Sequence, residues 1–122
     1  MKIIRGDIVE IDFGSNPDGS IQSGIRPAVV ISNNKGNSHS NILTVVPLSS
    51  KIDKKRYLPT HIFVPNNSCK GLFRNSIALA EQTTAVNFER LHQKLGNVNE
   101  SLMSEITKAV QIQIGVFEEY NR

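Results

Sequence analysis

The chain has 122 residues, of which 39% are hydrophobic and 20% are charged, and its formal net charge is +3. This length fits one domain with one core, so we expect residues 1–122 to fold as a single unit, and the low charged fraction excludes bulk disorder. The basic excess permits an anionic partner without requiring one. A single cysteine excludes an internal disulfide framework, so we expect a cytoplasmic protein. No window approaches about 18 consecutive apolar residues, so we expect no membrane span.

Short strands separated by turns are predicted over the first two thirds of the chain. Apolar and acidic residues alternate from Val9 to Phe13, which indicates a half-buried strand. Loops rich in turn-forming residues are expected over 14–20 and over 33–38. Strands this short and this closely spaced predict a small barrel or a strongly bent sheet. The later strands are expected over Ala28–Ser32, Leu43–Pro47, His61–Val64 and Ser76–Gln82.

The last part of the chain has the periodicity of a helix. Asn99 is a fair N-cap, and apolar residues recur after it at steps of three and four. The helix could run for about 20 residues, or about 30 Å, and a short helical turn is expected near Asn87–Leu91. Because one small barrel can hardly cover so wide an apolar face, we expect a homodimer. The stripe consists of Met103, Ile106, Val110, Ile114 and Phe117, broadened by Leu102, Ala109, Ile112 and Val116.

The most informative segment runs from Gly24 to Ser32, where Arg26 stands between a glycine hinge and a proline followed by a β-branched run. Arg26 is therefore expected at the start of a rigid strand, where its permanent charge suits phosphate recognition. Ser49–Ser50 follows the third predicted strand, and Glu81–Gln82 lies at the end of the fifth. Loops at strand ends can converge, and arginine, hydroxyl and amide groups without a metal suit a phosphodiester better than a carbonyl.

A purely structural interpretation of these residues stays open. Arg26 could form an ion pair with Glu81 or Asp7, and the serines and Gln82 could simply occupy a strand end and an exposed turn. The three histidines are expected at the surface or in turns rather than in catalysis, and the single cysteine is expected to be an ordinary thiol in a loop. The spacings typical of metal ligands and of nucleotide-binding loops are absent, so no metal and no cofactor is predicted.

Five segments form an ordered series along the chain. Arg5–Val9 comes first, and Gly19–Ser32 follows with a pattern close to GSEQxGxRPxVVIS. Val46–Ser49 fits VxPxT, Leu58–His61 reads LPTH, and Glu81–Gln82 fits (D/E)Q. Through these segments nearly the whole chain resembles the MazF/PemK/Kid family of toxin endoribonucleases from toxin–antitoxin pairs.

The resemblance implies a fold and an activity. The fold is mainly β, a small SH3-like barrel of the MazF/Kid/CcdB kind with a long C-terminal helix, in a homodimer. The activity is metal-independent cleavage of single-stranded RNA, often messenger RNA at a short sequence. The ribose 2′-hydroxyl attacks the adjacent phosphate and leaves a 2′,3′-cyclic phosphate and a 5′-hydroxyl. The expected partners are this RNA and a cognate antitoxin, which would thread an acidic segment into the same groove.

The resemblance also assigns roles to individual residues. The family's catalytic arginine falls on Arg26, which would stabilise negative charge on the phosphate. Its catalytic threonine falls on Ser49, whose hydroxyl would hold a phosphoryl oxygen. A basic run over 54–56 either steers the RNA backbone or is a solvated loop. The expected RNA-binding residues are Gln22, Ser50, Lys51, Glu81 and Gln82.

The chain departs from the family pattern at three places. Ile21 replaces the acidic residue of the signature, Thr83–Asn87 replaces a frequent RTID stretch, and an extra residue precedes Leu58. These departures leave the general base open, with Glu81 as the nearest acidic candidate. They also leave two alternatives, a non-catalytic RNA-binding relative and a gyrase poison of the CcdB type, which would not need both catalytic groups.

Overall fold

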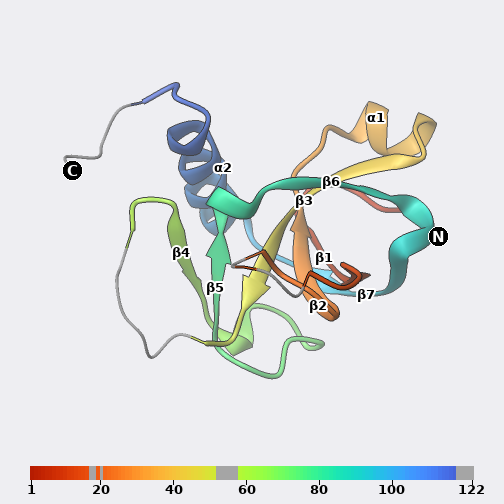
Figure 1. The fold of residues 1–122 in the computed structure, drawn as a ribbon, viewed down its shortest axis with the longest axis horizontal. Coiled ribbons are helices and arrows are strands. Elements are labelled where there is room, and N and C mark those ends of the chain that lie inside the picture. The colour runs from red at the N-terminus through yellow and green to blue at the C-terminus, as the bar shows by residue number, and fades with distance from the viewer. Residues whose placement is uncertain (17–18, 20, 52–57, 118–122) are drawn as a thin grey trace.

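Seven antiparallel strands and a C-terminal helix make up the core of the computed structural model, which describes residues 1–16, 19, 21–51 and 58–117 (Figure 1). The strands are β1 (Asp7–Asp12), β2 (Ile25–Val30), β3 (Ile42–Ser49), β4 (His61–Val64), β5 (Ser76–Leu79), β6 (Thr84–Asn87) and β7 (Leu91–Asn97). Their order is β4-β5-β3-β2-β1-β7, and β6 pairs with the first half of β3 outside this path. The mainly β class with a C-terminal helix is confirmed, although the sheet does not close into a complete barrel.

The strands that the alternation predicted are present, with shifted ends. β4 has the predicted bounds, whereas β2 begins at Ile25 rather than Ala28, so Arg26 lies inside the strand. The fifth predicted strand ends at Leu79 instead of Gln82. There the backbone N–H of Ala80 donates to the carbonyl of Thr60 at 3.0 Å, and the chain enters the 3₁₀ turn η2 (Ala80–Gln82).

One helix and two strands were not predicted from the sequence. The helix α1 (Asn34–His39) lies where a loop was expected; the Asn33 side chain caps it by accepting from the Gly36 N–H at 2.7 Å. The strands β6 and β7 were also missed, because both are largely exposed and therefore lack a clear apolar alternation. The helical turn expected near Asn87–Leu91 is confirmed as the 3₁₀ turn η3 (Phe88–Arg90), which lies between β6 and β7.

The C-terminal helix α2 (Glu100–Gln113) begins where predicted but is shorter than about 20 residues. The Asn99 side chain accepts a hydrogen bond from the Leu102 N–H at 2.8 Å, as expected of an N-cap. The helix ends because Gly115 takes a positive φ of 87°, a left-handed conformation that terminates helices. None of the helices in the described residues is long and apolar enough to cross a membrane.

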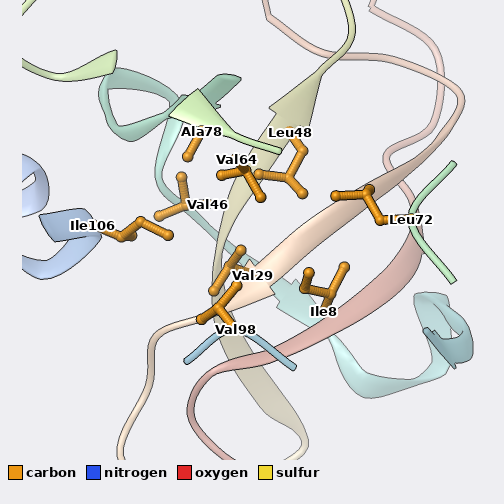
Figure 2. Packing of buried hydrophobic residues seen from close by; sticks show 9 residues of the cluster. All are labelled: Ile8, Val29, Val46, Leu48, Val64, Leu72, Ala78, Val98 and Ile106. Atoms are coloured by element: carbon orange, nitrogen blue, oxygen red, sulfur yellow. The ribbon is translucent and has the colours of Figure 1, made fainter. Parts of the chain in front are cut away.

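Buried side chains form two clusters on the two faces of the bent sheet. Alternating residues of β1 and β2 point to opposite faces, so that Ile8 and Val29 belong to one cluster and Val9 and Val30 to the other. Ile106 of α2 completes the first cluster, which Figure 2 shows, and thereby attaches the helix to the sheet.

The loop before β5 lies tightly on β7. A Cβ atom at Gly71 would lie 2.6 Å from the backbone oxygen of Leu95, and Gly96 of β7 makes a second contact of this kind with the same loop. Only glycine permits so close an approach. Leu72 is buried in the first cluster, whereas its neighbour Phe73 is 84% exposed. The loop is therefore held tightly against β7, while the Phe73 side chain extends from it into solvent.

Candidate functional site

Arg26 is held at the mouth of the β1–β2 loop. Gly24 takes a positive φ of 77° and closes the loop through backbone hydrogen bonds to Phe13 and Gly14 of 2.9 and 2.8 Å. Two residues later, Arg26 Nε donates to the backbone oxygen of Ser23 at 3.0 Å. Within the described residues the guanidinium makes no other hydrogen bond or ion pair. Its terminal nitrogens are therefore available to a ligand.

Asp7 does not pair with Arg26. Its buried carboxylate accepts a hydrogen bond from the Ile4 N–H at 2.8 Å and lies 3.2 Å from Lys94 Nζ. One of the structural partners considered for Arg26 is therefore engaged elsewhere, between β1 and β7.

Glu81 does not pair with Arg26 either. Its two carboxylate oxygens accept from Thr60 Oγ1 at 3.0 Å and from His61 Nε2 at 2.8 Å. His61 was expected at the surface or in a turn; it lies instead in β4 with its side chain 18% exposed, and the expectation that it has no catalytic role stays a prediction. With both oxygens engaged, Glu81 is poorly placed to act as a general base.

A pocket of about 230 Å³ lies beside Arg26 on the edge of the first core cluster. Leu48, Leu72 and Leu95 form part of its apolar wall. Strand pairing brings Glu10 of β1 and Gln93 of β7 opposite each other at this pocket. Its polar and aromatic lining consists of Glu10, Arg26, Ser50, Phe73, Arg74, Ser76 and Gln93.

The two hydroxyl residues at the end of β3 differ in position. Ser50 is exposed and lines the pocket together with Arg26. Ser49 is half-buried at the end of β3, where its Oγ accepts from the Lys51 N–H at 3.2 Å. This contact leaves the Ser49 hydroxyl proton available as a donor.

The two glutamines expected to contact RNA are joined to each other. The backbone N–H of Gln22 donates to Gln82 Oε1 at 2.8 Å, which links the β1–β2 loop to η2. The same bond restrains the loop that leads into β2 and Arg26. The basic run Lys54, Lys55 and Arg56 and the extra residue before Leu58 lie in or beside the segment outside the described residues.

Sequence reasoning missed four residues of the pocket. Glu10 and Gln93 meet only through the pairing of β1 with β7, a strand that was not predicted. One sequence pattern could have identified Phe73 and Arg74: an aromatic residue stands beside a basic one in a segment that contains Gly, Asn and Ser. This combination is typical of nucleic-acid contacts.

The family model described as "PemK-like, MazF-like toxin of type II toxin-antitoxin system" matches residues 4–114. The chain belongs to this family. The family named from the sequence motifs is therefore confirmed.

Individual relatives of this toxin family cover almost the whole chain. A protein named Endoribonuclease MazF from Staphylococcus saprophyticus is 35% identical over 112 residues, which are 92% of this chain and 91% of the relative. The crystal structure of MazF from Deinococcus radiodurans has a TM-score of 0.77 at 20% identity and covers 94% of this chain and 98% of its own. A mycobacterial endoribonuclease, solved in complex with its cognate antitoxin, has a TM-score of 0.75 at 22% identity, with coverages of 94% and 97%. The two structures show that the fold is shared.

Proposed function

We propose that this toxin is an endoribonuclease that cleaves single-stranded RNA, messenger RNA included, in the cytoplasm without a metal ion. The observation that carries the proposal is the guanidinium of Arg26, exposed at a pocket with a hydroxyl residue and unpaired at its terminal nitrogens within the described residues. The 35% identity to a protein named Endoribonuclease MazF supports the same activity. Residues 1–122 act as one domain in this proposal.

The proposed reaction uses the RNA's own nucleophile. The ribose 2′-oxygen forms a bond to the adjacent phosphorus and loses its proton, while the bond from phosphorus to the 5′-oxygen breaks and that oxygen gains a proton. The products are a 2′,3′-cyclic phosphate and a 5′-hydroxyl. Arg26 neutralises the charge that develops on the phosphoryl oxygens, and Ser49 donates a hydrogen bond to one of them.

The RNA path is proposed to continue on both sides of Arg26. Ser50 lines the pocket, and the adjacent Lys51 is exposed and suited to a phosphate. Gln22 and Gln82 would contribute amide groups beside the path, and Glu81 would contribute by holding η2 in place.

Incubation of the purified protein with a long RNA in EDTA tests the activity. Cleavage that persists in EDTA, with cyclic phosphate and 5′-hydroxyl ends, is the expected result. Intact RNA that remains bound would indicate a non-catalytic RNA-binding protein. Intact RNA together with stalled gyrase in a supercoiling assay would indicate a poison of the CcdB type.

Replacement of Ser49 by alanine is expected to slow cleavage by about 100-fold or more, because one donor to the phosphoryl oxygen is lost. Ser49→Thr keeps the hydroxyl and should be tolerated. The measurement is single-turnover cleavage of an end-labelled RNA by each variant. Ser50→Ala is the matched control and should have the smaller effect; a larger effect at Ser50 would assign the catalytic hydroxyl to that residue.

We expect the protein to be a homodimer. Beyond the end of α2, Ile114, Val116 and Phe117 are 68%, 57% and 41% exposed, which leaves apolar surface that a second copy can cover. Gel filtration with light scattering at micromolar concentration should give twice the chain mass of 13.5 kDa. A species of 13.5 kDa would contradict the expectation.

A cognate antitoxin is the proposed protein partner. The mycobacterial endoribonuclease was solved in complex with its cognate antitoxin, and MazF from Deinococcus radiodurans was also solved together with MazE. An acidic segment in the Arg26 groove would exclude RNA, so inhibition should compete with RNA and weaken as the salt concentration rises.

A further inference from the structure

Phe73 is the most exposed of the large hydrophobic side chains in the described part of the chain, at 84%. It lines the same pocket as Arg26, and the exposed Arg74 follows it directly. An exposed aromatic ring in a pocket that two arginines also line suits a planar, negatively charged ligand. Bases of single-stranded nucleic acids stack on such rings while basic groups hold their phosphates.

The loop that carries Phe73 is preorganised. Its base is held against β7 at Gly71, and Leu72 anchors it in the core. Its end is held by the Asn75 side chain, which accepts a hydrogen bond from the Asn66 N–H at 2.8 Å. A ring on a fixed loop loses little freedom when a base stacks on it, so the contact contributes more to binding.

Glu10 and Gln93 supply hydrogen-bonding groups at the same pocket. Gln93 Nε2 donates to Glu10 Oε1 at 3.0 Å, which fixes both side chains. The second carboxylate oxygen of Glu10 and the amide oxygen of Gln93 have no partner among the described residues. These groups are acceptors, so they suit a base edge with an exocyclic amino group, as in adenine, cytosine or guanine, better than uracil, whose base edge offers N3–H as its one strong donor.

We infer that this pocket is a subsite for one unpaired base of the RNA, which stacks on Phe73 and is read by Glu10 and Gln93 beside the phosphate held by Arg26. The inference rests on the proposed function and names its base-recognition site. The pocket volume of about 230 Å³ is of a size that can receive a single base. The competing occupant is an apolar side chain of a protein partner.

The first test replaces Phe73 with alanine. Loss of one stacking contact should lower kcat/KM for a short RNA by about 5- to 150-fold, through KM more than kcat. Phe73→Tyr should restore most of the loss, because the ring is kept. Phe63→Ala is the matched control, since Phe63 is 47% exposed on β4 and lines a different groove; it should leave kcat/KM unchanged. The urea midpoint of Phe73→Ala should equal that of the wild type.

The second test detects stacking without cleavage. The chain contains no tryptophan, so Phe73→Trp introduces a single tryptophan, which can be excited selectively in the presence of the two tyrosines. A pool of short RNAs with 2′-O-methyl riboses, which lack the nucleophile, should quench its fluorescence, whereas Phe63→Trp should respond little. Unchanged Phe73→Trp fluorescence under conditions where anisotropy shows binding would overturn the inference.

The third test concerns the base edge. Glu10→Gln introduces an amide donor, and it should weaken the discrimination against uracil at one position of the cleavage sequence, as read by sequencing the RNA ends. An unchanged sequence preference would remove Glu10 from base recognition.

These tests separate the inference from the proposed activity. If the wild type does not cleave RNA but Phe73→Trp is quenched, the activity fails and the base subsite stands. If the wild type cleaves RNA and Phe73→Ala matches it, the subsite fails and the activity stands. If Phe73→Ala weakens only the binding of the antitoxin, the pocket belongs to the protein partner and the inference is wrong.

Discussion

Arg26→Ala is expected to reduce RNA cleavage by about 100- to 1,000-fold, the typical effect of removing one donor that stabilises charge in a transition state. The side chain is exposed, and its one hydrogen bond within the described residues is the 3.0 Å contact to Ser23. The fold should therefore survive, with a change in unfolding free energy within about 0.5 kcal/mol. Single-turnover cleavage at saturating enzyme measures the first effect, and urea denaturation measures the second.

Arg26→Lys provides the control for charge. Lysine keeps one positive charge but lacks the planar fork that can bind two phosphoryl oxygens together, so it should restore little activity. A near-normal rate for Arg26→Ala would remove this residue from the mechanism. A near-normal rate for Arg26→Lys would show that charge alone is sufficient.

Ile106→Ala is expected to lower the free energy of unfolding by about 2–5 kcal/mol, because the substitution leaves a cavity in a fully buried site. Ile106 is 0% exposed, and it joins α2 to the cluster shown in Figure 2. Urea denaturation at one fixed protein concentration measures the effect, because unfolding of a dimer depends on concentration. Ser104→Ala, at an exposed position of the same helix, is the control and should change stability by less than about 0.5 kcal/mol. Equal stabilities for the two variants would show that the helix contributes little to the core.

The predictability of the fold followed the strength of the local patterns. Apolar and acidic residues alternate in β1, and β4 is a compact, mostly apolar run, so both strands were predicted. β7 has mostly exposed side chains at one edge of the sheet, so its existence depends on pairing with β1, which no local pattern reveals. The end of α2 was missed because the apolar stripe continues past Gly115, whose left-handed conformation stops the helix.

The residues of the candidate site also differ in how strongly the local sequence pattern predicted them. Arg26 and Ser50 lie at strand ends with clear local signals, and the structure places both at one pocket. Glu10 looks like an ordinary exposed position of an alternating strand, and its position at the pocket follows from the pairing with Gln93. Phe73 reaches the pocket because a glycine contact folds its loop onto β7. Such contacts between distant parts of the chain are invisible to periodicity and spacing.

In the loop that packs on β7, the residues that anchor the loop are different from the residues proposed to contact the ligand. Gly71 and Leu72 carry the anchoring contacts, whereas Phe73 and Arg74 extend into solvent. Mutations at positions 73 and 74 therefore change the surface offered to RNA at almost no cost in foldability. A chain with this architecture can change the side chains that it presents at positions 73 and 74 without altering the contacts that anchor the loop.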